Sequence, residues 1–383
     1  MGTQKYILIF SSVFSLLCIS AISLSFYVNP YKLKSFIPST ALGIYFGGSR
    51  TSKAIAITEG DYNAFILGSS RSEIGIDPNN KLWGELNVYN ASLAGSSFSE
   101  TYKVFETIVK HRKPELLVLA LDYSLFSTTR TTSADFNLSR FDNSNNDFLS
   151  FFKERLSKEA IEKSFRALKY KKLNLPSKHA SGQKNGSLTF TKKISTIGQY
   201  ALIQNTLNKR VIRNNENYST NPHSKFRLQQ LSQLIKICLE EEIKLIIFIS
   251  PVHALQLMTF HEIGLWGEFL DWKKDLVKIT KKFPHTALYD FTDLSPFITE
   301  DIPVNKIESM RWFWETSHYK SILGDKILDN ILSHSPHKTT FGTKLNEKNI
   351  TTELNKQDTL FQHYMQKNTA LLYDIQELIN KID

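Results

Sequence analysis

The chain contains very little cysteine, and this excludes two kinds of structural framework. Only two of its 383 residues are cysteines, Cys18 and Cys238, so neither a set of disulfides nor a CxxC metal site can form. The ten histidines include no HExxH or HxH pairing. We therefore expect no metal site.

The phosphate-binding glycine motifs GxGxxG and GxxxxGK[ST] are absent, and no internal repeat is present. We therefore expect no cofactor. The 47 lysines and arginines outnumber the 37 acidic residues and give a formal net charge of +10. This excess favours an anionic neighbour, such as an acidic polysaccharide or a phospholipid surface. Nucleic acid is not favoured, because the lysines are scattered along the chain.

Residues 6–31 carry no charged side chain, and this apolar run is long enough to cross a membrane as a helix. It predicts an N-terminal membrane anchor within residues 1–31. A cleavable signal peptide is the alternative, because Lys5 supplies a positive start and Ala21 and Ser23 are small. A single anchor before a large domain favours an extracytoplasmic position for that domain.

Five apolar runs predict buried strands, and helical patterns lie between them. Continuous β-branched and leucine runs are typical of parallel strands covered on both faces. The spacing of Ser97 and Glu100 predicts a helix start between the second and third strands. Alternating strands and helices predict an α/β fold with helices on both sides of a mainly parallel sheet. The predicted strands are residues 64–68, 86–92, 116–122, 244–250 and 286–291.

The pattern divides the chain after the anchor into a neck at 32–60, an α/β domain at 61–335 and a C-terminal amphipathic helix at 336–383. A largely helical insertion at about 125–222 interrupts the domain. Within it, residues 147–172 predict an amphipathic helix, and the polar, lysine-rich residues 175–193 predict a mobile loop. The insertion is a lid, a substrate platform or packing bulk. The C-terminal helix docks back on the domain or pairs with a partner.

Polar residues follow several predicted strands, at the edge where ligands bind to parallel sheets. Ser70 follows the first strand, Gly95 the second and Ser124 the third, while Glu315 and His318 come near the end of the domain. Acyl transfer needs an accessible hydroxyl, an imidazole to take its proton, and donors for the oxyanion. Each residue also has a purely structural interpretation. Ser70 is then a turn or helix-cap residue and Gly95 a plain turn glycine, while Glu315 is an acid at a helix start and His318 a surface histidine.

The order of these segments resembles the SGNH, or GDSL-like, hydrolase superfamily, with its GDSxS, NxxxxG, GxND and DxxH blocks. The resemblance implies a three-layer, flavodoxin-like α/β/α fold. It also implies Ser70 as nucleophile, His318 as general base and Glu315 in place of the orienting aspartate. Gly95 matches the oxyanion glycine of the second block, and Asn90 matches its first residue.

Two positions depart from the pattern of the superfamily. Ser69 replaces the aspartate of the first block, and the third block has no asparagine, since Asp122 and Ser124 occupy that stretch. Arg71 or Ser124 then assists an oxyanion hole built from backbone N–H groups.

Further candidates lie outside the four blocks. His253, just beyond the fourth predicted strand, binds substrate, acts as an alternative base or is satisfied within its own loop. Trp312, Phe313 and Trp314 stack on sugar rings or belong to the core.

The chain is most similar to the membrane-anchored or periplasmic branch associated with bacterial surface polysaccharides. This implies a serine esterase or O-acyltransferase acting on acyl, chiefly acetyl, esters of a cell-surface or exported polysaccharide. The resemblance places the protein at the bacterial inner membrane with its main domain in the periplasm, and an acyl-donor membrane protein is a possible partner. The alternative is a catalytically silent SGNH-like protein that binds an acidic glycan and assists polysaccharide export or assembly.

Overall fold

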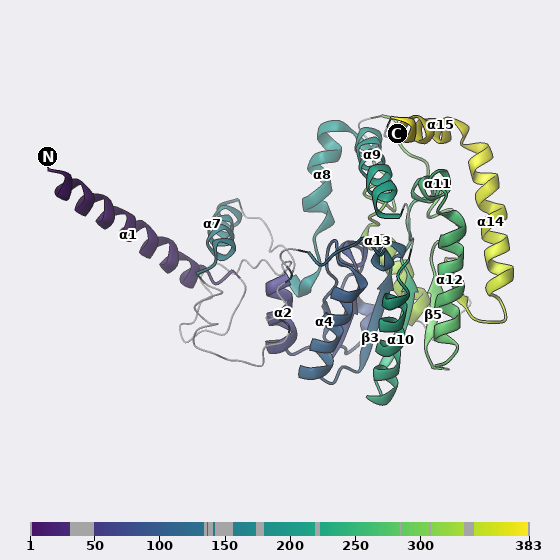
Figure 1. Cartoon of the computed structure of the whole chain (residues 1–383), viewed down its shortest axis with the longest axis horizontal. Helices are drawn as coiled ribbons and strands as arrows, with labels where there is room; N and C mark the ends of the chain where they lie inside the picture. The colour runs from purple at the N-terminus through teal and green to yellow at the C-terminus, as the bar shows by residue number, and fades with distance from the viewer. Residues whose placement is uncertain are drawn as a thin grey trace. The chain divides into compact units, whose positions relative to one another are not determined.

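The computed structural model divides the chain into two compact units (Figure 1). The first contains Met1–Glu59 and Asn137–Ala180, and the second contains Gly60–Phe136 and Ser181–Asp383. The structure describes residues 2–30, 50–133, 136, 141, 156–173, 180–218, 223–283, 285–305, 308–332 and 341–381.

The second unit is built on a six-stranded sheet with the order β2-β1-β3-β4-β5-β6. The first five strands in the chain pair in parallel, and β6 pairs antiparallel with β5. The expected α/β fold with a mainly parallel sheet is confirmed. The sixth strand was missed because its three residues, TKL, form no apolar run. The strands are β1 (Ala64–Leu67), β2 (Val88–Asn90), β3 (Leu116–Leu121), β4 (Lys244–Ile249), β5 (Ala287–Asp290) and β6 (Thr343–Leu345).

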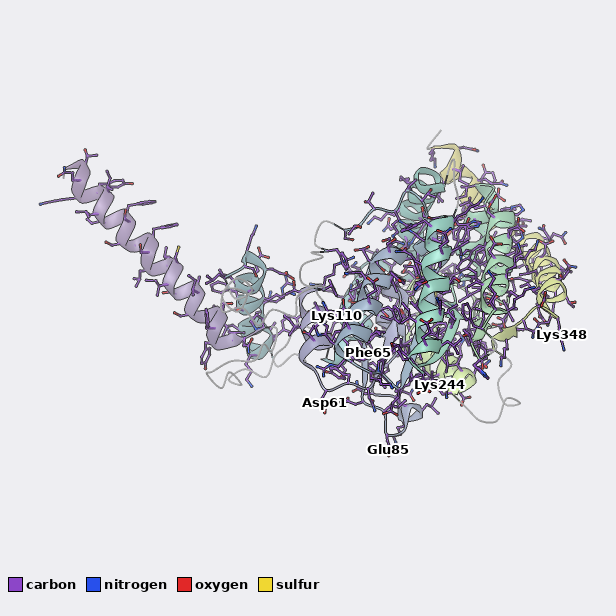
Figure 2. All side chains as sticks on the ribbon, turned by 60° about the horizontal axis from the view of Figure 1, so that its bottom comes forward. Asp61, Phe65, Glu85, Lys110, Lys244 and Lys348 are labelled. Atoms are coloured by element: carbon purple, nitrogen blue, oxygen red, sulfur yellow. The ribbon has the colours of Figure 1, made fainter. Side chains whose placement is uncertain are left out.

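The centre of the sheet is buried on both faces, which explains the continuous apolar runs. All six residues of β3 are buried, as are all four of β1. β3 pairs with β4 along its whole length, from Leu116 opposite Lys244 to Leu121 opposite Ile249. Figure 2 shows Phe65 of β1 among the crowded side chains of this unit, where it is 1% exposed.

Helices lie on both sides of the sheet. α4 (Phe98–His111), α10 (Lys225–Glu240) and α12 (Trp266–Thr280) pack in a row, and Figure 1 shows α4 and α10 in front of the strands. Right-handed crossovers place α3 (Ser70–Gly75) on the opposite face, where α13 (Ser321–Leu332) packs against it. α4 begins with the predicted capping box of Ser97 and Glu100.

Two glycines let α13 approach α3 closely. A Cβ atom on Gly324 would lie 1.8 Å from the carbonyl oxygen of Gly75, and one on Gly75 would lie 1.9 Å from the Tyr319 ring. Larger residues cannot occupy these positions without separating the two helices. This contact brings the segment just before α13, including His318, next to the start of α3.

The insertion contributes α8 (Gly186–Ile197) and α9 (Gln199–Tyr218) to the second unit. The prediction of a mobile loop at 175–193 is wrong for residues 186–193, which form most of α8. The Asn185 side chain caps this helix by accepting a bond from the Leu188 N–H at 3.1 Å, and Phe190 and Ile194 pack with Ile74 and Trp314. Residues 175–179 of that loop lie outside the described residues.

The C-terminal segment differs from the single helix expected at 336–383. It contains β6 and two helices, α14 (Ile350–Lys367) and α15 (Thr369–Asn380), which are separated at Asn368. Both helices dock on the second unit. On α14, Phe361 stacks on Trp266 of α12 with ring centroids 4.1 Å apart, and on α15, Ile375 is fully buried.

The first unit contains α1 (Thr3–Val28), α2 (Arg50–Glu59) and α7 (Lys158–Lys172). α1 is long and apolar enough to cross a membrane, with a mean hydropathy of 2.4 over its most apolar window. α7 corresponds to the predicted amphipathic helix at 147–172 from Lys158 onward, whereas residues 147–155 lie outside the described residues. Most of the predicted neck, residues 31–49, also lies outside them.

Candidate active site

A tight turn from β1 to α3 presents Ser70 at the carboxyl edge of the sheet. β1 ends at Leu67 and α3 begins at Ser70, with Ser69 as the N-cap. The Ser69 hydroxyl accepts a hydrogen bond from the Arg71 N–H at 3.2 Å. Ser70 is partly exposed whereas its neighbours Ser69 and Arg71 are buried, so Ser70 is the hydroxyl in this turn that a ligand can reach.

Ser70, His318 and Glu315 form a continuous hydrogen-bonded chain. Ser70 Oγ lies 2.8 Å from His318 Nε2, and His318 Nδ1 is hydrogen-bonded to Glu315 Oε1. The His318 side chain is 15% exposed and that of Glu315 is 3% exposed. The structure thus brings together the three residues expected to carry the chemistry, in the order hydroxyl, imidazole, carboxylate.

Glu315 is held in its ionised form. Burial alone would raise the pKa of its carboxyl group, but the charge of His318, the hydrogen bond from His318 and the charge of Arg210 outweigh burial and lower the pKa to about 2. Oε2 accepts from the Ser317 N–H at 3.1 Å, and Oε1 from the His318 N–H at 3.0 Å. A carboxylate fixed in this way orients the imidazole and stabilises its protonated form.

The loop that carries Gly95 runs beside the Ser70 turn. Ala91 N–H donates to the Ile66 carbonyl at 2.8 Å and Leu93 N–H donates to the Gly68 carbonyl at 2.9 Å, so the chain after β2 continues along β1. Gly95 is exposed and has a φ of 68°, a conformation that favours glycine. Among the described residues, its N–H group has no acceptor.

Asn90 has a structural role rather than the expected role at the oxyanion or substrate. It is fully buried, and its amide donates to the carbonyls of Ser72 and Ile76 at 2.9 and 3.0 Å. Its Oδ1 accepts from the Ser92 N–H at 3.2 Å. The NH2 group therefore ties α3 to β2, while Oδ1 bonds to the turn that follows β2, so neither end of the amide is directed at a ligand.

Arg71 and Asp122 also bond to other protein side chains. Arg71 Nη1 lies 2.7 Å from Asp122 Oδ1 in a buried ion pair, and Arg71 Nε donates to Ser317 Oγ at 3.1 Å. The other carboxylate oxygen of Asp122 accepts from the Ser69 hydroxyl. The expectation that Arg71 assists the oxyanion is not supported by this geometry, because its guanidinium bonds join the third block to the histidine loop.

Ser124 lies in η2 (Tyr123–Phe126), directly after β3, and is connected to Gly95 through Arg130. Arg130 Nη1 donates to Ser124 Oγ at 3.0 Å and to its carbonyl at 3.2 Å, while Nε donates to the Gly95 carbonyl at 3.2 Å. Arg130 therefore holds the second and third blocks together at the site edge.

His253 does not line the site as a base or substrate ligand. It is fully buried as the N-cap of α11 (Ala254–Glu262), where Nδ1 accepts from the Leu255 N–H at 3.3 Å. Nε2 lies 2.8 Å from the Glu300 carbonyl, and the His253 N–H donates to the Thr316 carbonyl at 3.0 Å. Its role is to support the loop that carries Glu315 and His318.

The aromatic cluster before Glu315 divides between the core and the site. Phe313 is fully buried, whereas Trp314 is half-buried and stacks on Phe190 of α8 with centroids 5.7 Å apart. Phe190 also packs against the His318 ring at 5.7 Å. The insertion therefore supplies one wall beside the His318 imidazole, although no motif in α8 indicated this.

Several supporting residues were not identified from the sequence. Ser317 lies inside the Glu-Thr-Ser-His segment, so the sequence already placed it next to the candidate histidine. Arg130 and Arg210 lie in the insertion, outside the four blocks, and only the folded chain shows their contacts. Within the described residues, no group of three or more His, Cys, Asp or Glu side chains could hold a metal ion.

The fold and the site together define a parallel α/β protein with a serine–histidine–glutamate arrangement at the carboxyl edge of its sheet. No family model matches the sequence, and no curated protein is significantly similar to it. The resemblance to SGNH hydrolases therefore rests on the order of the four blocks along the chain.

Proposed function

We propose that this protein is a serine esterase or O-acyltransferase of the SGNH type that acts on acyl esters of a cell-surface or exported polysaccharide. The observation that carries the proposal is the hydrogen-bonded chain from Ser70 through His318 to Glu315. A protein that only binds glycans has no need for such a chain.

In the first half-reaction Ser70 Oγ attacks the acyl carbonyl while His318 Nε2 takes its proton across the 2.8 Å hydrogen bond. The imidazolium that forms is stabilised by the Glu315 carboxylate at Nδ1. His318 then gives the proton to the departing sugar oxygen, which leaves an acyl-serine. In the second half-reaction water or an acceptor hydroxyl attacks this ester, with His318 again as base.

The oxyanion is bound by backbone N–H groups in this mechanism. Ser70 is the first residue of α3, so its N–H has no intrahelical acceptor, and Gly95 presents a second N–H from the neighbouring loop. The third donor of the SGNH superfamily is an asparagine, and this chain has none in the third block. Asp122 lies in that stretch but is paired with Arg71. One missing donor costs about 3–4 kcal/mol of transition-state stabilisation, so we expect slow turnover of simple esters.

The polysaccharide substrate and the location are inferred from the resemblance and the charge. α1 is a candidate membrane anchor, and a single anchor before a large domain favours the periplasmic side. The net charge of +10 is compatible with an acidic glycan.

The test is p-nitrophenyl acetate turnover by the full chain in detergent, beside Ser70→Ala and His318→Ala. Ser187→Ala, on the exposed face of α8, is the matched control because it removes a hydroxyl outside the site. We expect both site variants to lose turnover at unchanged melting temperature while the control retains it. Turnover by Ser70→Ala at the native rate would falsify the mechanism.

A glycan-binding protein without catalysis remains the alternative, and the missing asparagine favours it. A serine-reactive fluorophosphonate separates the two, because it reports activation of the hydroxyl without needing the right acyl group. Labelling at Ser70 that is lost in His318→Ala supports the enzyme. An unlabelled wild-type chain that binds an acidic polysaccharide supports the alternative.

A further inference from the structure

The first unit contains a feature that the acyl-transfer site does not use. Residues 3–20 of α1 are exposed, and coverage by the rest of this unit begins at Ala21, with Ser25 and Val28 fully covered. The bare part has 18 residues and is therefore about 27 Å long. This length is close to the roughly 30 Å thickness of the hydrocarbon core. Coverage of α1 thus begins where a spanning helix would leave the hydrocarbon.

α7 supplies part of that coverage. One face of α7 is fully buried through its small residues Ala160, Ser164 and Ala167. Ala167 packs with Val28, and Leu24 and Tyr170 pack against this pair, which fixes α7 beside the last two turns of α1. If α1 spans a membrane, α7 lies at the level of the lipid headgroups.

A second face of α7 is apolar, and two of its three residues are exposed while Ile161 is half-buried. Ile161, Phe165 and Leu168 follow one another at the i, i+4, i+7 spacing, so they form one stripe about 100° from the buried face. Phe165 is 56% exposed and Leu168 is 38% exposed. Exposing this stripe to water is unfavourable, which indicates an apolar environment for it in the assembled protein.

The charge on α7 has the sign that an anionic lipid surface requires. The helix carries six basic and two acidic side chains. The two acidic residues are paired, Glu159 with Lys163 at 2.8 Å and Glu162 with Lys158 at 3.8 Å. The basic residues with no ion pair among the described residues are Arg166, Lys169, Lys171 and Lys172.

We propose that α7 is an interfacial helix that lies on the membrane crossed by α1. Ile161, Phe165 and Leu168 enter the boundary between headgroups and acyl chains, and the unpaired cations bind anionic phospholipid headgroups. Lipid is favoured over a protein partner because α7 is already fixed at the end of the spanning helix. This surface is independent of the acyl-transfer site.

The test measures the depth of single positions in the full chain reconstituted in vesicles of phosphatidylcholine and phosphatidylglycerol. In a Cys18→Ser, Cys238→Ala background, Phe165→Cys carries an environment-sensitive NBD label, and Arg166→Cys is the matched control. The control is adjacent in sequence but turned by about 100° around the helix. We expect blue-shifted emission at 165 that doxyl-labelled lipids quench, and weaker quenching at 166.

Equal responses at both positions overturn the proposal. So does a blue shift at 165 that doxyl lipids do not quench, because that outcome indicates a protein on the stripe. Lys169→Gln, Lys171→Gln and Lys172→Gln together test the headgroup contacts, with an expected weakening of docking of about fivefold per lysine. Docking that is unchanged by these substitutions and by omission of phosphatidylglycerol overturns the role of the cations.

Discussion

Arg71 and Asp122 form a buried ion pair next to the Ser70 turn, with 2.7 Å between Nη1 and Oδ1. Their side chains are 9% and 1% exposed. Through Ser69 on one side and Ser317 on the other, the pair links the nucleophile turn, the end of β3 and the histidine loop. Three segments that are far apart in the sequence are thereby fixed around Ser70.

Breaking this pair on one side should destabilise the fold strongly. Asp122→Asn leaves the Arg71 charge buried without its counter-ion, and such a loss costs about 3–5 kcal/mol of unfolding free energy. Urea denaturation of the variant measures this. The matched control is Lys281→Gln, which breaks the exposed Lys281–Glu347 pair and should cost less than about 1 kcal/mol. Equal effects of the two substitutions would contradict a buried, uncompensated charge.

Arg130 should act as a positioning residue, because it bonds to both Gly95 and Ser124. Arg130→Gln removes the planar fork that reaches both partners. We expect a lower kcat and slower fluorophosphonate labelling of Ser70, with little change in melting temperature. Thr132→Ala, in the same loop and exposed, is the control. A change in KM alone would indicate that Arg130 contacts the substrate instead.

The sequence was sufficient for five of the six strands and for the three residues of the hydrogen-bonded chain. Long buried strands such as β3 are visible as apolar runs because both of their faces are covered. Ser70 and His318 follow from the rule that ligands bind at the carboxyl ends of parallel strands. β6 could not be found in this way, since its three residues depend on pairing with β5.

The roles of individual polar side chains were not predictable in the same way. Asn90 and Arg71 were assigned to the oxyanion or substrate from their places in the block pattern, but both bond inside the protein. For His253 the structure agrees with the alternative that it is satisfied within its own surroundings. The order of strands and loops in the sequence predicts that a residue lies near the edge of the sheet. The direction of its side chain depends on partners such as Ser317 and Glu300. These partners come from segments of the chain that no local pattern connects.

The C-terminal helix α14 is anchored by a buried lysine. Lys273 Nζ donates to Asp290 Oδ2 and to Gln357 Oε1, both at 2.6 Å, and all three side chains are buried. Gln357→Ala leaves Lys273 with one acceptor fewer, which should cost about 1–3 kcal/mol of unfolding free energy. Lys356→Ala, an exposed neighbour on α14, should have almost no effect. Similar urea midpoints for the two variants would contradict this anchoring.

Glu315 should contribute stability that is lost in acid. Its pKa in the folded chain is lowered to about 2 from the usual value of 4.5, so the unfolded chain binds its proton more readily. The contribution is complete above pH 4.5, declines as the pH falls toward 2, and is on the order of 3 kcal/mol. Glu315→Gln should therefore flatten the pH dependence of urea stability in this window. It should also lower kcat by about three to four orders of magnitude, because a glutamine cannot stabilise the imidazolium.

His253 should produce a separate acid-dependent loss of stability at higher pH. Burial lowers the pKa of its imidazole from 6.5 to about 4, although the hydrogen bond to the Glu300 carbonyl opposes the shift. The neutral imidazole is also favoured by its role as the cap of α11, where Nδ1 accepts from the Leu255 N–H. A proton on Nδ1 would remove this cap. Stability is then complete above pH 6.5 and is lost as the pH falls toward 4, by about 3 kcal/mol.

His253→Asn tests this assignment, because asparagine also caps helices but does not titrate in this range. We expect the variant to show a flat urea midpoint between pH 6.5 and 4, where the wild type declines. His261→Asn is the control, since that histidine is partly exposed near the end of the same helix and should leave the decline unchanged. A decline that persists in His253→Asn would assign it to another group.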